Sequence, residues 1–272
     1  MAPRRAAVWA LVGLFVGLPR GALAQTPAPA VVSRPMVQRA GGLAVLAASS
    51  VAASRVGGGR GIAGVGLHLA LTVGLGRGFE VDGGLGLRDP SDGARLAADR
   101  YARIDREDVY QVGNRTLGNP YLRARFALLD RPDVPVHVGL DALLVAPLAE
   151  QTALSLGVGA PVHLVLGARV RVESGLFLQV IPSDSSFLRN VVNVPLRVNV
   201  RLGAVVTLGL VTGLVAANVG RDTAEPVRIP LGLQGYLRVQ PRTDVVFQVL
   251  YPALEPFGTD AMGFGVGILA RR

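Results

Sequence analysis

Residues 65–75 read VGLHLALTVGL, and this stretch decides the fold. Every second residue, from Val65 to Leu75, is valine or leucine, and the residues between them are glycine, histidine, alanine and threonine. Alternate side chains of a β-strand point to opposite faces. The stretch therefore predicts a strand with one strongly apolar face and one small or polar face.

The same alternation recurs along most of the chain. A weaker first strand is expected at 42–53, and ten further strands are expected at 79–88, 121–128, 134–144, 154–166, 170–180, 194–202, 206–214, 227–239, 245–251 and 262–270. The pattern thus predicts an all-β protein of about twelve strands, with ten or fourteen as alternatives.

The charged residues of these strands all fall on the face opposite to the apolar one. A soluble β-sandwich also alternates, but its strands are usually about 5–6 residues long. Most of the strands expected here are longer and match the length that crosses a bilayer at a tilt. We therefore predict a closed antiparallel transmembrane β-barrel with a charged interior. The residues expected to line its lumen are His68, Glu80, Asp82, Arg88, Arg123, Arg125, His137, Asp141, His163, Arg171, Glu173, Arg197, Asn199, Arg201, Arg228 and Arg238.

The connections between the strands alternate between short and long. The long ones are expected at 54–60, 89–119, 145–153, 181–193, 215–226 and 252–261. Outer-membrane barrels have short periplasmic turns and longer outer loops, and an even strand number places both termini in the periplasm. A closed barrel is required because lipid cannot satisfy the hydrogen bonds of an open sheet edge.

The first residues have the features of an export signal. Arg4 and Arg5 precede an apolar run at 6–18, which is too short to span a bilayer as a helix, and residues 22–24 read ALA, a small-residue cleavage site. An uncleaved anchor helix is the alternative. We predict a signal peptide at 1–24, a periplasmic N-terminal segment at 25–41, a barrel at 42–272 and a Gram-negative outer-membrane location.

Composition narrows the partners. The chain has no cysteine, which excludes disulfides and thiolate chemistry, and its formal charge of +9 comes entirely from arginine, without lysine. Nucleic-acid binding needs clustered basic residues, whereas these arginines are spread along the chain. The expected partners are outer-membrane lipid and lipopolysaccharide, the barrel-insertion machinery during assembly, and small solutes, with no nucleic acid.

The sequence offers no clear catalytic or metal site. The three histidines are expected inside the barrel on different strands and at different depths, without ligand spacing, so hydrogen-bonded interior histidines are the favoured interpretation. No hydrolase motif accompanies the serines. We predict a non-enzyme without cofactor, metal or catalytic residues.

Two other features are open to more than one interpretation. The long loop 89–119 carries many charges and forms either a constriction at the barrel mouth or a solvent-facing surface loop. Inward glycines, Gly74 among them, leave space in the lumen or let another part of the protein pack closely there.

Residues 116–147, TLGNPYLRARFALLDRPDVPVHVGLDALLVAP, resemble the outer-membrane proteins linked to the meta pathway of phenol degradation. Gly118, Arg123 and Pro147 match that family, whereas Asn119 stands where Asp is usual and Pro147 lacks the Thr-Gly that often follows. The resemblance implies a transporter-like barrel and names no substrate.

The charge of the predicted interior suggests a function. Its eight arginines and four carboxylates favour passive passage of small solutes with a mild anion preference, because arginine rings favour anions. The alternative is a structural or surface-interaction barrel whose lumen is closed by arginine–carboxylate pairs. Glu173 with Arg197 or Arg201 is the expected pair of that kind.

Overall fold

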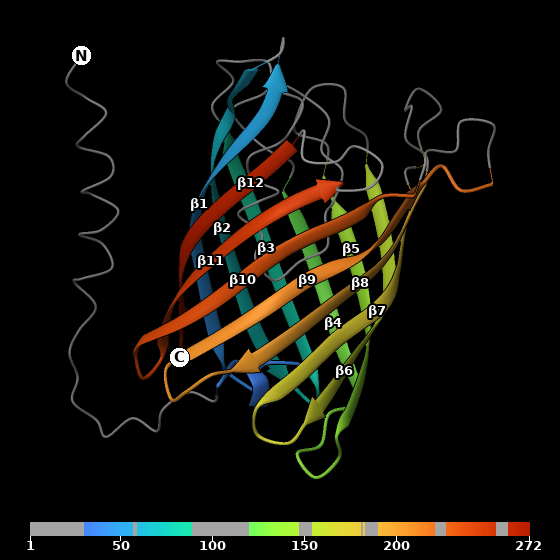
Figure 1. Cartoon of the computed structure of the whole chain (residues 1–272). Helices are drawn as coiled ribbons and strands as arrows, with labels where there is room; N and C mark the ends of the chain where they lie inside the picture. The colour runs from blue at the N-terminus through green and yellow to red at the C-terminus, as the bar shows by residue number, and fades with distance from the viewer. Residues whose placement is uncertain are drawn as a thin grey trace.

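Twelve antiparallel strands close into a barrel in the computed structural model of the chain (Figure 1). The structure describes residues 30–56, 59–88, 120–146, 154–180, 182, 190–220, 227–253 and 261–272. The predicted loop 89–119 and the predicted signal peptide lie outside these residues. Among the described residues, no helix is long and apolar enough to cross a membrane.

The strands follow one another around the barrel in chain order. Their bounds are β1 Leu43–Val56, β2 Gly59–Gly76, β3 Phe79–Arg88, β4 Tyr121–Leu129, β5 Val136–Val145, β6 Ser155–Leu166, β7 Val170–Val180, β8 Asn190–Arg201, β9 Val206–Ala217, β10 Ile229–Gln240, β11 Thr243–Ala253 and β12 Ala261–Arg271.

The barrel closes between the first and the last strand. β1 pairs antiparallel with β12, from Ala44 opposite Arg271 to Ser54 opposite Ala261. Every strand thus has two hydrogen-bonded neighbours, and no edge is left open. The predicted fold class, a closed antiparallel barrel of twelve strands, is confirmed.

The two faces of the wall differ as the alternation predicted. Leu156 and Val158 of β6 point outward and are exposed, whereas Ser155 and His163 of the same strand are buried inside. The same division holds across the barrel: large apolar side chains cover the outside and polar side chains are enclosed. This distribution is the reverse of that in a soluble protein, whose apolar side chains are buried, and it suits a wall that faces lipid.

The predicted loop 54–60 is mostly strand. β1 continues to Val56 and β2 begins at Gly59, with Ser54 opposite Gly61 and a register shift between Ala52 and Ala53. The prediction of a loop was wrong here because glycine-rich sequence lacks the alternation that marks strands, although paired backbone does not need it.

The N-terminal segment, residues 30–40, enters the barrel at its short-turn end. It begins with the 3-10 helix η1, Val31–Ser33, which contacts β7 and β8. Figure 1 shows this segment in blue beside the short turns, at the end where the C-terminus also lies. The sequence predicted residues 25–41 as a periplasmic segment and did not predict that this part packs inside the wall.

Candidate functional site

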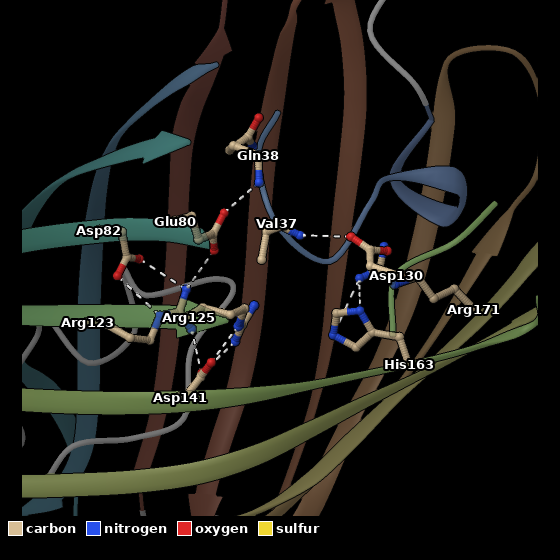
Figure 2. Close-up of polar contacts among 10 residues, drawn as sticks. All are labelled: Val37, Gln38, Glu80, Asp82, Arg123, Arg125, Asp130, Asp141, His163 and Arg171. Carbon is tan, nitrogen blue, oxygen red and sulfur yellow. Dashed lines mark hydrogen bonds and ion pairs between the residues drawn. The ribbon is translucent and has the colours of Figure 1, made fainter. Parts of the chain in front are cut away.

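One cluster of charges lies where β3, β4 and β5 run side by side (Figure 2). The register of β3 against β4 places Glu80 opposite Arg125 and Asp82 opposite Arg123. Arg123 donates to both carboxylate oxygens of Asp82, at 3.2 and 3.1 Å. Arg125 donates to both oxygens of Asp141, at 2.6 and 2.7 Å. These two-pronged pairs fix the guanidinium planes and largely neutralise this sector.

A second cluster lies on β6, β7 and β8 and has more arginine than carboxylate. Glu173 is 2.8 Å from Nε of Arg171 and 3.8 Å from Nη1 of Arg197, its partner in the register. The predicted pairing of Glu173 with Arg197 is therefore present in the structure. One carboxylate serves two buried arginines here, so the sector keeps a positive excess.

A third cluster surrounds Asp244 at the start of β11. Arg271 donates to it at 2.6 Å, Nε of Arg238 lies 3.8 Å away, and Arg34 of the N-terminal segment also donates to it. Arg34 lies over the ring of Tyr236 at 5.7 Å. Burial lowers the pKa of the Arg34 guanidinium to about 10, so it stays protonated at neutral pH.

The histidines are arranged differently from the prediction. The register places His137 directly opposite His163, so these two do not lie at different depths. His137 lies 2.8 Å from Asp130 of the β4–β5 turn, His163 contacts Arg171, and His68 stacks on Tyr121 with ring centroids 6.2 Å apart. The shared depth was missed because alternation gives only the face of each side chain, and the long connection predicted at 145–153 does not fix the register of β5 against β6.

Four further residues were predicted to line the interior: Asn199, Arg201, Arg228 and Arg88. Asn199 is fully buried and accepts a hydrogen bond of 2.7 Å from Gln234. Arg201 lies at the short-turn end of β8, where its Nε donates to the carbonyl of Gly203 at 2.9 Å. Arg228 forms a bridge with Val215 just before β10, and Arg88 ends β3, where its side chain lies outside the described part of the structure.

The N-terminal segment is held by side chains of the wall. The backbone N–H of Gln38 donates to Glu80 at 2.8 Å, and that of Met36 donates to Asp130 at 2.9 Å (Figure 2 shows the Gln38 contact). Arg171 donates to the carbonyl oxygens of Arg34, at 2.9 Å, and Val31, at 3.2 Å. The apolar side chains of the N-terminal segment are also buried: Val31, Val32, Met36 and Val37.

The N-terminal segment separates two cavities. On its inner side lies a cavity of about 170 Å³, lined by six arginines and two glutamates together with His163. On its other side lies a vestibule of about 940 Å³, bounded by the β2–β3 and β4–β5 turns. Arg34, Pro35, Val37 and Gln38 line both cavities, so this stretch forms the partition between them.

Sequence reasoning missed Arg34, Asp130, Asp244 and Arg271. Asp244 and Arg271 share the parity of the inward face, but the predicted strands began at 245 and ended at 270, one residue short of each. Asp130 belongs to a turn, where the alternation of apolar and polar residues does not apply. Arg34 contacts a residue 210 positions away along the chain, which no local pattern predicts.

Comparisons with solved structures agree with the barrel fold. The chain is similar to the NanC porin, with a TM-score of 0.59 and 9% identity over 83% of this chain and 98% of that one. It is also similar to the KdgM porin in complex with disordered oligogalacturonate, with a TM-score of 0.56 and 7% identity over 84% and 98%. A third similar structure is the COG4313 outer membrane channel from Pseudomonas putida F1, with a TM-score of 0.56 and 11% identity over 90% and 99%.

The chain therefore shares the closed β-barrel fold of these outer-membrane proteins. No protein-family model and no curated protein sequence matches it. At these identities the likeness concerns the fold alone.

Proposed function

We propose that this protein is an outer-membrane channel for passive passage of small solutes, with a mild preference for anions. The observation that carries the proposal is the arginine-lined cavity inside a barrel whose outer face is apolar. A buried core would fill such a space with apolar side chains, whereas a polar interior is typical of barrels that hold water. The resemblance of residues 116–147 to transporter-like barrels supports the same function.

The anion preference follows from unequal charge pairing around the cavity. Within the described residues, Nε of Arg197 and both Nε and Nη1 of Arg271 are buried without a hydrogen-bond partner. Buried donors are normally satisfied by water or a ligand. A charge 4 Å from such a group gains about 1 kcal/mol in water and about 4 kcal/mol at an effective dielectric of 20, so these few arginines are enough to favour an anion over a cation.

The same proposal includes the surroundings of the barrel. The apolar outer band would contact lipid, the long connections would face lipopolysaccharide, and both termini would lie in the periplasm after cleavage of residues 1–24. The barrel-insertion machinery would then act on the mature chain.

A liposome-swelling assay tests the proposal. Vesicles containing the purified protein are exposed to an anionic, a neutral and a cationic solute of matched size. We expect the anion to enter fastest and the cation slowest. Equal entry of all three would contradict the anion preference, and no entry above empty vesicles would contradict the channel.

A second candidate function is a structural barrel that transports nothing. The observation that favours it is the bidentate pairing of Arg123 with Asp82 and of Arg125 with Asp141, which occupies one side of the interior. This candidate predicts no solute entry and no current even when the protein is fully inserted.

A further inference from the structure

The N-terminal segment is attached to the wall in a way that differs from the strands. The backbone hydrogen bonds that continue the β1–β2 pairing end at Gly41 and Gly42, just before β1. The N–H of Gly41 donates to the carbonyl of Gly74 at 2.9 Å, and the N–H of Gly74 donates to the carbonyl of Gly42 at 2.8 Å. Gly41 has a φ of 71°, a conformation that favours glycine, and the chain turns there into the barrel. Residues 30–40 are thus a separate element joined to the barrel at a glycine hinge.

The wall is shaped to receive this element. A Cβ at Gly74 would lie 2.7 Å from the carbonyl oxygen of Gln38 and would overlap that of Arg39. A Cβ at Gly139 of β5 would lie 2.7 Å from Sδ of Met36. Both glycines face inward, so the missing side chains provide the space in which the N-terminal segment lies.

The carboxylates that hold the N-terminal segment would keep partners without it. Asp244 retains Arg271 at 2.6 Å, Asp130 retains His137 at 2.8 Å, and Glu80 retains Arg123 at 3.9 Å. Departure of the segment would therefore leave none of these three carboxylates buried without a cation or histidine beside it. This matters because a buried charge left without a partner is very costly, whereas a partner offsets much of that cost.

The vestibule gives the segment a place to go. It lies directly on the far side of residues 34–38, at the short-turn end of the barrel, and is larger than the inner cavity. Rotation about Gly41 and Gly42 would carry the segment toward it, and the two cavities would then join.

Resting on the channel function proposed above, we propose that residues 30–40 form a plug that closes the barrel at its short-turn end and undocks to open it. The docked plug keeps solute in the inner cavity from reaching the vestibule. Undocking exposes the wall arginines, among them Arg197 and Arg271, to a continuous path. The plug thus controls access to the same arginines that would select anions.

Single-channel conductance in planar bilayers tests this plug in the full chain. Gly74→Ala places a methyl group where the plug backbone lies and should displace it. A second variant replaces residues 34–38 with a glycine–serine run of equal length, which keeps the chain length but removes the docking contacts. Gly157→Ala is the matched control, because the atoms nearest to a Cβ there belong to the wall residues Leu143 and Leu178 and not to the plug. Heat-modifiable migration establishes that each variant is folded.

We expect a several-fold rise in conductance for both plug variants and no change for Gly157→Ala. If Gly74→Ala does not fold, the 34–38 variant decides. Wild-type conductance in every variant would overturn the plug and leave the channel standing. Inserted protein that conducts in no variant would overturn both the plug and the channel.

Discussion

Asp141 of β5 accepts two hydrogen bonds from the Arg125 guanidinium of β4, at 2.6 and 2.7 Å, and also lies 3.5 Å from Arg123. Asp141 is thus the bidentate partner of Arg125, whereas Arg123 has its own bidentate partner in Asp82. Both arginines are about nine-tenths buried, so the Arg125–Asp141 pair is a buried ion pair.

Asp141→Asn should destabilise the barrel by about 3 kcal/mol, because removal of one partner leaves buried charge uncompensated. The matched control is Asp133→Asn, which breaks the exposed Arg131–Asp133 pair of the β4–β5 turn and should cost less than about 1 kcal/mol. Urea unfolding in lipid vesicles measures both free energies. Equal costs for the two variants would contradict the buried network.

Arg197→Ala should reduce anion selectivity more than Arg201→Ala. Arg197 is buried beside the inner cavity, whereas Arg201 is bound to the carbonyl of Gly203 at the turn. Loss of a charge whose interaction with the anion is worth about 1 kcal/mol lowers the permeability ratio by about fivefold. The ratio is obtained from ion permeabilities in planar bilayers, and a larger effect for Arg201→Ala would show that the arginines at the turn select the ion instead.

Leu69→Arg should block or weaken assembly, with a cost of about 2–4 kcal/mol near the bilayer midplane. Leu69 points outward and is 41% exposed, whereas Thr72 of the same strand lines the inner cavity. Thr72→Arg should be milder, because its new charge would face water and Asp82, its cross-strand partner. Folding yields into vesicles separate the two, and equal yields would mean that the two faces are wrongly assigned.

The wild-type protein should migrate as a compact band when unheated and as a slower band after boiling. A closed barrel has no free edge from which detergent can unfold it, so its hydrogen-bonded wall survives without heat. Far-UV circular dichroism should show β structure in the unheated sample. One band position under both conditions, with a helical spectrum, would contradict the barrel.

The barrel was predictable from sequence because its signal is local. The alternation in 65–75 fixes which side chains face outward, and the two-residue turn at Arg77–Gly78 fixes the register of β2 against β3. The same alternation predicts that Glu80, Asp82, Arg123 and Arg125 all face inward, but which of them pair depends on the β3–β4 register, which the long connection 89–119 does not fix.

The plug was not predictable in the same way. Residues 30–40 have no period of two, and their contacts reach Asp130 and Asp244, which are 94 and 210 positions away from their partners. One signal was present: Gly74 was among the inward glycines predicted either to leave space in the lumen or to let another part of the protein pack closely, and the structure shows close packing against Gln38 and Arg39. The cavity between the plug and the wall depends on such long-range packing and therefore required the structure.

The measurement that tests the channel most directly is the reversal potential of the wild-type protein in a planar bilayer under a salt gradient. We expect a measurable current and a reversal potential on the side of anion preference, shifted toward zero in Arg197→Ala. A reversal potential that favours cations would contradict the selectivity assigned to the buried arginines. Confirmed insertion without current, in the wild type and in the variant whose residues 34–38 are replaced by a glycine–serine run, would contradict the channel itself.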